Sequence, residues 1–220
     1  MIGGDICTRS CKFCNTRTGR PLPLDPDEPL HVAESVALMK LSHAVITSVD
    51  RDDLPDLGAA HWAQTIREIK RLNPETTTEV LIPDFQGRKE LVSQVIEAGP
   101  EIISHVKRIS PQVRSAANYH TSLEVIRQIA ESGTTAKSGI MVGLGETPAE
   151  VEELMDDLIA VGCKILTIGQ YLQPTHKHYP VVAYITPEQF AIYKETGLKK
   201  GFEQVESAPL VRSSYHAEKH

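Results

Sequence analysis

Short apolar runs rich in β-branched residues alternate along the chain with longer stretches in which apolar positions recur every three or four residues. The short runs predict buried strands, and the longer stretches predict helices with one apolar face. The predicted strands cover residues 1–6, 44–47, 78–82, 102–105, 135–142 and 164–168. The predicted helices cover residues 30–40, 58–72, 89–97, 123–131, 147–160 and 187–199.

Local signals support several of these boundaries. Thr147 is placed to cap a helix, with Pro148 at its first position and Glu150 three residues after the cap, which is the pattern of a capping box. Gly133 follows the helix predicted at 123–131 and supplies a C-terminal stop.

Six βα units in succession predict a parallel sheet, because a helix must carry each strand back to the start of the next. A complete barrel would have eight units, so the expected fold class is α/β, a partial (β/α)6 TIM-like barrel. We expect a single domain over residues 1–220, with the barrel core at about 1–200 and a C-terminal tail at 201–220.

In such folds the chemistry lies at the carboxyl ends of the strands. Four polar or glycine-rich loops follow predicted strands one, two, five and six and should converge on one mouth. These loops are residues 7–14, 48–53, 143–146 and 169–174.

The amino-acid composition limits the classes of binding partner to be expected. The chain has 220 residues, 40% of them hydrophobic and 24% charged, which is typical of a globular protein. We expect no membrane partner, because no apolar run is long enough to span a bilayer. A net charge of −6 argues against nucleic acid as the main partner. The start has no secretory signal, so a cytoplasmic location is expected, or an organellar one for a eukaryotic chain whose beginning is missing.

Three of the four cysteines, Cys7, Cys11 and Cys14, lie within eight residues in the spacing C-x3-C-x2-C. Three thiolates at this spacing can reach three corners of one 4Fe–4S cube and leave the fourth iron open to a small molecule. A zinc site would need a fourth ligand, and the nearby histidines lack ligand-like spacing. Disulfide bonds would leave one thiol unpaired, and three unrelated buried cysteines would be unusual in so polar a loop.

Four cations surround this loop without an intervening acid: Arg9, Lys12, Arg17 and Arg20. One interpretation is a solvated loop. The other is a docking site for an anionic cofactor or an acidic partner protein.

The cysteine triplet, with Phe13 directly before its last cysteine, resembles the cluster motif of the radical S-adenosylmethionine (SAM) enzymes. In that superfamily the open iron chelates SAM, and an electron from the cluster cleaves it to a 5′-deoxyadenosyl radical. The predicted partial barrel agrees with the fold that this resemblance implies.

Longer motifs resemble lipoyl synthase and follow one another through nearly the whole chain. They are TGRP at 18–21, TSVDRDDLPD at 47–56, KSGIMVGLGET at 137–147, TIGQYLQP at 167–174 and RSSYH at 212–216. The resemblance implies a sulfurtransferase that inserts two sulfur atoms at C6 and C8 of a protein-bound octanoyl-lysine. An unactivated C–H bond offers nothing to acid–base or nucleophilic attack, so a cofactor must carry the hard step.

The same resemblance implies the cofactors and partners. One 4Fe–4S cluster and SAM are expected, and in the family a second, auxiliary 4Fe–4S cluster is taken apart to supply sulfur. The carrier would be an octanoylated lipoyl domain of a 2-oxoacid dehydrogenase or a glycine cleavage protein. A ferredoxin or flavodoxin would act as reductant.

Roles carry over position by position. The resemblance assigns the SAM-binding cluster to Cys7, Cys11 and Cys14, and Ser214 matches the serine that caps the auxiliary cluster. Candidates for cofactor contact are Phe13, Ser48, Asp50, Lys137, Ser138, Gly143, Glu146, Gln170 and Tyr171.

Blander interpretations stand beside these assignments. Phe13 could be a core aromatic, and Ser214 part of an ordinary polar tail. Gly143 could merely supply a positive φ angle. The acidic residues Asp50, Asp52 and Asp53 could form a solvated loop or a divalent-metal site.

Four further residues have chemically versatile side chains but are interpreted as structural. We interpret Cys163 as a small buried hydrophobe and Trp62 as core. The pair His176 and His178 is interpreted as a surface loop, because no third metal ligand is evident.

The chain departs from the lipoyl synthase pattern in three places. The family's auxiliary triplet C-x4-C-x5-C is absent from the printed sequence, so Ser214 would have no cluster to cap. After the fourth predicted strand, the family's His-Asn-x-Glu is replaced by His105-Val106-Lys107-Arg108 in a shorter stretch, and Arg108 reverses the charge expected there. Leu57 stands where the family has a glycine. Two competing hypotheses follow: a degenerate or truncated relative acting as a binding or regulatory module, and a radical enzyme with another reaction.

Overall fold

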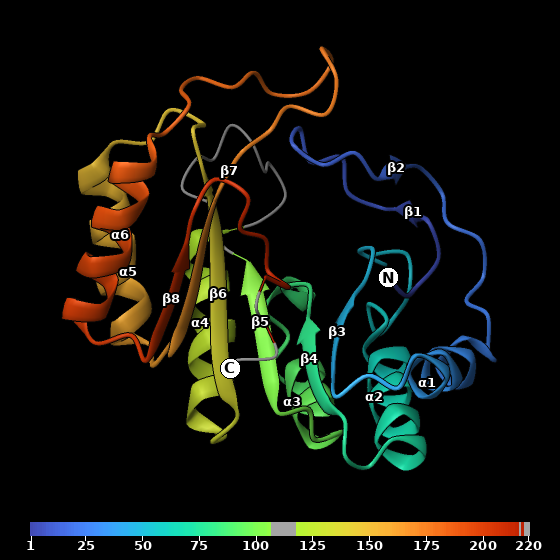
Figure 1. Cartoon of the computed structure of the whole chain (residues 1–220). Coiled ribbons are helices and arrows are strands. Elements are labelled where there is room, and N and C mark those ends of the chain that lie inside the picture. The colour runs from blue at the N-terminus through green and yellow to red at the C-terminus, as the bar shows by residue number, and fades with distance from the viewer. Residues whose placement is uncertain (107–117, 216, 218–220) are drawn as a thin grey trace.

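A curved, open, all-parallel sheet forms the centre of the computed structural model, which describes residues 1–106, 118–215 and 217 (Figure 1). In the described ranges the sheet has six strands, and they follow one another in chain order from β3 to β8. They are β3 (His43–Thr47), β4 (Thr77–Leu81), β5 (Ile102–Val106), β6 (Thr135–Val142), β7 (Ile165–Gln170) and β8 (Gln204–Ser207).

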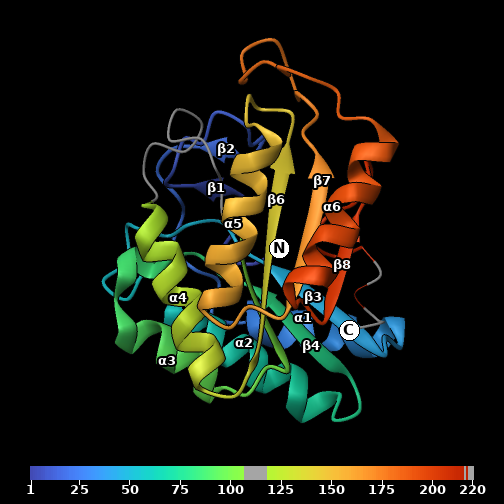
Figure 2. The ribbon, with the colours of Figure 1, turned by 90° about the vertical axis from the view of Figure 1, so that its left-hand side faces the viewer.

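Helices return the chain between successive strands and lie along the outer face of the sheet (Figures 1 and 2). In Figure 2, α4, α5 and α6 stand in front of the strands that they connect. The helices are α1 (Glu28–Met39), α2 (Ala59–Leu72), α3 (Lys89–Glu97), α4 (Tyr119–Glu131), α5 (Pro148–Ala160) and α6 (Pro187–Lys200), with a short 3-10 turn, η1 (Phe85–Gly87).

One large apolar core fills the space between the sheet and the helices. Trp62 and Ile66 of α2, Ile126 of α4 and Leu158 of α5 are each at most 2% exposed. Burial of these side chains removes apolar surface from water, at roughly 25 cal/mol per Å². The buried Trp62 confirms its assignment to the core, and Cys163, at 3% exposure, confirms that its thiol is buried.

Most elements predicted from periodicity are present with closely matching bounds. The helix at 89–97 and the strand at 135–142 have the predicted limits. The capping box on α5 is formed: the Thr147 hydroxyl accepts from Glu150 N, and the Glu150 carboxylate accepts from Thr147 N at 2.7 Å.

The strand predicted at residues 1–6 is wrong. Gly3 and Gly4 have φ angles of 81° and 92°, in the left-handed region that interrupts an extended strand. Only Ile2 pairs beside the sheet, in an isolated parallel bridge with Ser48. The two-residue β1 (Ile6–Cys7) pairs instead with β2 (Arg17–Thr18), outside the main sheet.

The sixth strand of the sheet is β8, in the region expected to be a tail. After β8 the chain turns back along the inner side of the sheet. Val211 is 2% exposed, and Gln170 N donates to Pro209 O at 3.2 Å. Gly169 permits this approach, because a Cβ atom there would lie 2.1 Å from Val211 O.

Within the described ranges, no helix combines the length and the apolar character needed to cross a membrane.

Candidate active site at the cysteine loop

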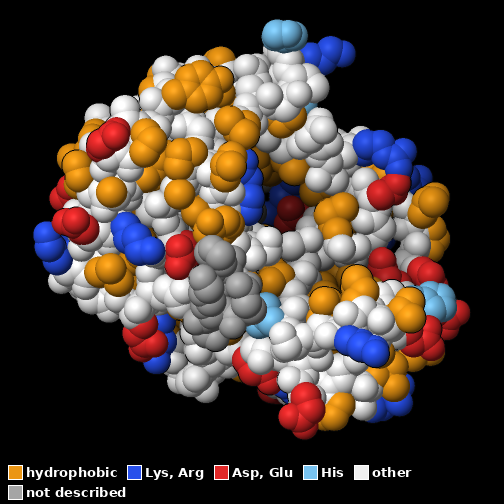
Figure 3. All heavy atoms as spheres, viewed as in Figure 1, with side chains coloured by type: hydrophobic (Ala, Val, Ile, Leu, Met, Phe, Trp, Pro, Cys, Tyr) orange, Lys and Arg blue, Asp and Glu red, His pale blue; other side chains and the backbone are white. Residues whose placement is uncertain are grey.

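The cysteine loop, residues 7–14, lies over the carboxyl ends of β3 and β4, where the sequence pattern predicted a mouth. It borders a pocket of about 260 Å³. The space-filling view shows a hollow on this side of the molecule, with cationic and acidic side chains inside it (Figure 3). The pocket is lined by Cys7, Arg9, Cys11, Phe13, Cys14, Thr16, Ser48, Val49, Asp50, Leu81, Ile82, Pro83 and His105.

All three clustered cysteines contribute to this lining. Cys7 is buried, whereas Cys11 and Cys14 are half-buried. The sulfur of Cys7 accepts from Arg9 N and Asp50 N, both at 3.4 Å. Burial raises the pKa of the Cys7 thiol, and these two backbone N–H groups partly offset the rise. A metal bound to the sulfur would also favour the thiolate form, as these backbone donors do.

The three thiols that line the pocket form a donor set that could hold a multi-iron cluster. Among the described residues, no three His, Cys, Asp or Glu side chains gather closely enough to hold one metal ion. Zinc requires four ligands around one point. In a cubane cluster each thiolate binds a different iron, so its three cysteines stand further apart around a shared volume. Three thiols around one open pocket are a donor set of this second kind.

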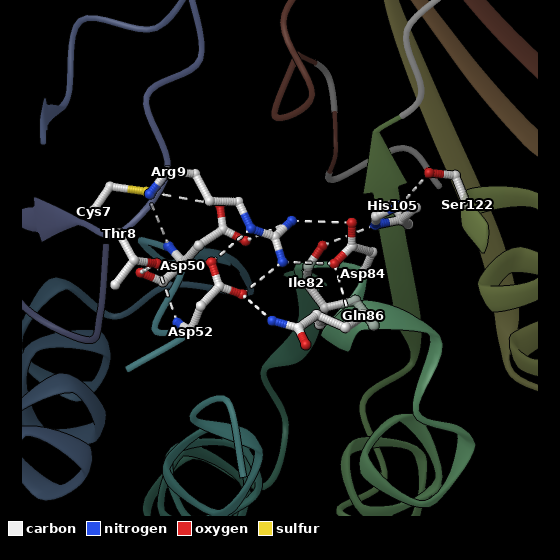
Figure 4. A network of polar contacts seen from close by, with 10 residues as sticks. All are labelled: Cys7, Thr8, Arg9, Asp50, Asp52, Ile82, Asp84, Gln86, His105 and Ser122. Carbon is white, nitrogen blue, oxygen red and sulfur yellow. Dashed lines mark hydrogen bonds and ion pairs between the residues drawn. The ribbon is translucent and has the colours of Figure 1, made fainter. Parts of the chain in front are cut away.

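Beneath the cysteine loop, Arg9 forms the centre of a buried ionic network (Figure 4). Its guanidinium lies between Asp52, in the loop after β3, and Asp84, in the loop after β4. It donates to both oxygens of Asp52 at 2.7 and 2.8 Å and to both oxygens of Asp84 at 2.8 and 3.0 Å. Asp50 completes the network, 3.4 Å from Arg9 Nη1.

This network corrects two interpretations of the loop charges. Arg9 is 8% exposed, so it is neither a solvated loop cation nor a free docking site. Asp50 and Asp52 are its partners rather than a solvated acidic run, and the exposed Asp53 pairs with Arg51 at 2.9 Å. The signal available in the sequence was Arg9 in the cysteine loop and the alternating Asp50 and Asp52 in the loop after β3.

A small apolar cluster forms the other wall of the mouth. Leu144 and Tyr171 are buried there, and the half-buried Phe13 packs against them while it also lines the pocket. The Tyr171 hydroxyl donates to Tyr179 O at 2.7 Å. Phe13 therefore packs in an apolar cluster and also borders the pocket, whereas its contact with a cofactor stays a prediction.

The remaining candidates on β6 and β7 organise loops rather than line the pocket. Glu146 accepts from the backbone N–H groups of Gly143 and Leu144, the latter at 2.9 Å. Gln170 binds Ala183 O and Ile185 N, at 3.1 and 2.9 Å. Gly143 has a φ angle of 94°, and a Cβ there would lie 2.3 Å from the Gln170 amide nitrogen. These contacts hold residues 182–185 against the sheet.

Lys137 and Ser138 lie inside the sheet, apart from the pocket lining. Lys137 Nζ is fully buried and donates to Glu79 at 2.9 Å and to Ser213 O at 2.8 Å. Ser138 donates to His105 O at 2.9 Å. Both side chains therefore bind partners within the protein, and neither lines the pocket beside the cysteines.

Ser214 follows Ser213, whose carbonyl oxygen accepts from Lys137, and its side chain is exposed.

Of the two histidines interpreted as a surface loop, His176 is exposed. The ring of His178 instead contacts the cysteine loop, with Nε2 3.1 Å from Cys14 O. A neighbouring bond from Tyr179 N to Lys12 O, at 2.7 Å, fastens the same two segments.

Two of the departures from the family pattern concern Leu57 and the stretch after His105. Leu57 has a φ angle of 52°, in the left-handed region where a glycine would be free of strain. The altered stretch after His105 falls at residues 107–117, including Arg108, and lies outside the described residues.

The parallel partial barrel and the three cysteines at its mouth define the radical SAM class, and the "Radical SAM superfamily" profile matches residues 1–158. Within that superfamily the chain belongs to the lipoyl synthase family. It is 93% identical to a lipoyl synthase of Bacteroides fragilis, covering all of this chain and 78% of the relative. A lipoyl synthase of Treponema denticola is 61% identical, again over all of this chain and 77% of the relative.

Solved structures independently support the fold. Streptococcus suis SuiB bound to S-adenosylmethionine superposes with a TM-score of 0.73 at 10% identity, covering 97% of this chain and 50% of that one. Methylornithine synthase gives a TM-score of 0.68 at 10% identity, covering 97% of this chain and 72% of that one. At this identity the likeness concerns the fold alone.

The family match favours lipoyl synthase chemistry over the degenerate relative and over another radical reaction.

The alignment with the Bacteroides fragilis protein runs over 224 positions, whereas this chain has 220 residues, so the relative is longer within the matched span. That relative also extends beyond the matched span, since 78% of it is covered.

Proposed function

We propose that this chain acts in lipoyl cofactor formation, with Cys7, Cys11 and Cys14 holding one 4Fe–4S cluster at the barrel mouth. The overall reaction replaces C–H bonds by C–S bonds at C6 and C8 of an octanoyl-lysine on a carrier domain. The observation that carries the proposal is the opening of all three thiols onto one pocket, in a chain 93% identical to a lipoyl synthase.

The donor set of the pocket fits the proposed cofactors. Three thiols supply three iron ligands, and the remaining lining offers both polar and apolar groups. When bound, the cluster supplies the electron that cleaves SAM and begins the radical reaction. Ser48 and Asp50 would contact the polar end of SAM, and Phe13 would lie near the adenine, since all three line the pocket.

The chain's own residues shape the space in which the reaction occurs. The backbone N–H groups at Cys7 stabilise its thiolate form, which is the form that binds iron. The apolar wall of Phe13, Leu144 and Tyr171 limits access of water to one side of the mouth. Glu146 and Gln170 act indirectly, because they fix the loops after β6 and β7.

Three further components of the reaction would be supplied to this site: the carrier domain, the reductant and the sulfur. The carrier would be an octanoylated lipoyl domain of a 2-oxoacid dehydrogenase or a glycine cleavage protein, and a ferredoxin or flavodoxin would reduce the cluster in the cytoplasm. Sulfur would come from a second 4Fe–4S cluster, toward which Ser214 is the residue of this chain that the family motif indicates.

Formation of 5′-deoxyadenosine tests the radical step directly. The chain is purified without oxygen, reconstituted with iron and sulfide, reduced with dithionite and given SAM. Wild type and the control Cys163→Ala, whose thiol is outside the pocket, should form 5′-deoxyadenosine. Alanine at Cys7, Cys11 or Cys14 should abolish it. Product from all three variants, or none from an iron-loaded wild type, would contradict the proposal.

Sulfur insertion is a separate measurement. An octanoylated carrier domain is added to the same mixture and its mass is followed, because each inserted sulfur changes the mass of the octanoyl chain. Formation of 5′-deoxyadenosine without a gain of sulfur would show that the radical site works and that the supply of sulfur is what is missing.

A further inference from the structure

The cysteine loop has little regular structure to hold it in place. Its flanking strands, β1 and β2, are two residues each, and within the described residues they pair only with each other. Few backbone bonds tie the loop to the barrel. One joins Thr8 N to Asp50 O at 3.1 Å, and another joins Tyr179 N to Lys12 O at 2.7 Å. Side-chain contacts must therefore contribute strongly to its position.

Arg9 makes the most extensive of these contacts. It lies between the first two cysteines, and its guanidinium extends toward Asp52 and Asp84 (Figure 4). Paired bonds to Asp52 and Asp84 connect the loop to the carboxyl ends of β3 and β4 together. A planar guanidinium that binds two carboxylates through two bonds each has a fixed orientation, which a lysine cannot reproduce.

The contacts extend from Arg9 to the neighbouring cysteine. The Thr8 hydroxyl donates to Asp52 at 2.8 Å and accepts from Asp52 N at 3.1 Å. Arg9 N donates to the Cys7 sulfur at 3.4 Å, as does Asp50 N. Asp50 thus contacts both the guanidinium and the first thiol, and Arg9 itself contributes a backbone donor to that thiol.

Charge makes the arrangement dependent on Arg9. An arginine side chain stays protonated in proteins, so the buried guanidinium is a permanent cation at this position. Three carboxylates face this one cation, and Asp84 is 2% exposed. Without the cation, the carboxylates would repel one another and any thiolate above them.

We propose that Arg9 is a positioning residue for the iron-binding loop, which it fixes against the ends of β3 and β4 before any cluster is present. The role of the loop in binding iron rests on the proposed function, whereas the fixing of the loop does not. Loss of Arg9 should release the loop locally and leave the sheet folded.

Hydrogen exchange of the reduced, iron-free chain tests this proposal. Exchange is followed by mass spectrometry in wild type, Arg9→Met and Arg9→Lys. The control is Arg17→Met, because Arg17 belongs to the same loop region but is exposed and pairs only with Asp5 among the described contacts. Peptides covering residues 5–20 report on the loop, and peptides from β6 and β7 report on the sheet.

In Arg9→Met we expect exchange of the loop peptides to accelerate by roughly tenfold or more, with the sheet peptides unchanged, because the opening is local. Arg9→Lys should be intermediate, since it keeps the charge and loses the paired bonds. Arg17→Met should match wild type. Alkylation of Cys7 should accelerate in parallel, with the buried Cys163 as an internal standard.

Two results would overturn the proposal: loop exchange in Arg9→Met equal to that of wild type, or equal acceleration in loop and sheet, which would indicate general destabilisation. If Arg9→Met fails to fold, Arg9→Lys and Asp84→Asn carry the same comparison, with a smaller local acceleration expected. Iron uptake by the same proteins is measured afterwards. Absence of iron from wild type would refute the proposed function and leave the exchange result valid.

Discussion

Two buried ionic contacts lie in different parts of the molecule: one connects a loop to strand ends, and the other connects two strands within the sheet. At the mouth, Arg9 joins an irregular loop to the ends of two strands through Asp52 and Asp84. Within the sheet, Lys137 of β6 joins Glu79 of β4, two strands away, and reaches the returning C-terminal segment at Ser213 O. The first contact is bordered by a pocket, whereas the second is fully enclosed.

The difference shows what a buried charge contributes in each setting. Around Lys137 the strands are already fixed by backbone ladders, so its pairing mainly keeps Glu79 from being left alone in the core. Around Arg9 no ladder joins the cysteine loop to the main sheet in the described part of the chain, so the side chains determine geometry. A change at Lys137 should therefore affect the whole fold, and a change at Arg9 mainly the loop.

The largest effect is expected from Lys137→Met. It leaves the fully buried Glu79 without its cation, which should lower the free energy of unfolding by about 3–5 kcal/mol. Urea denaturation measures the loss, and the double variant Lys137→Met with Glu79→Gln should recover part of it. A loss below about 1 kcal/mol would remove the contrast between the two networks.

A second prediction concerns the close approach of the C-terminal segment to the sheet. Gly169→Ala would place a Cβ 2.1 Å from Val211 O, so the segment must move, at a cost of about 1–3 kcal/mol. Limited proteolysis should then cleave the chain faster after β8. Gly19→Ala is the matched control, since its Cβ would meet only Ile6 at 3.6 Å. Equal behaviour of the two variants would contradict the close packing.

The mouth network should also give a pH dependence. Bonding to Arg9 lowers the pKa of Asp52 from 3.8 to about 2. A carboxyl group with a lowered pKa stabilises the fold fully above its ordinary value and loses that contribution as the pH falls through its folded value. The contribution, on the order of 2 kcal/mol, should disappear between pH 3.8 and about 2. Denaturation of wild type and Asp52→Asn across this range should show their difference narrowing, and a constant difference would argue against the pairing.

The smallest effect is expected outside both networks, at the cap of α5. Thr147→Ala removes the hydroxyl that accepts from Glu150 N and should cost about 1 kcal/mol. Thr147→Ser keeps the hydroxyl and should remain close to wild type. Thermal denaturation of the Thr147→Ala and Thr147→Ser variants measures this cost. A loss of stability in Thr147→Ala equal to that in Lys137→Met would contradict the expected order of effects.

Much of the fold could be predicted from local patterns. Strands and helices with strong periodicity, such as β6 and α3, appear with the predicted limits, and the capping box of α5 is formed. The first strand failed because Gly3 and Gly4 adopt positive φ angles, which override a short apolar pattern. β8 was missed because Val205 is the single apolar residue among its four.

The site could be predicted only as far as residues close in sequence. The spacing of Cys7, Cys11 and Cys14 indicated a shared site, and all three line one pocket. Asp84 was missed because it reaches Arg9 across 75 positions, a pairing that no local pattern contains. Lys137 shows the opposite case: the motif around it suggested cofactor contact, while its side chain lies buried against Glu79.

The count of metal bound to the purified chain tests the central claim most directly. Anaerobic reconstitution followed by iron, sulfide and zinc analysis should give about four irons per chain in wild type. Alanine substitution of Cys7, Cys11 and Cys14 together should give almost none. One zinc and no iron, or about eight irons in wild type, would contradict a single cubane cluster held by these three cysteines at the barrel mouth.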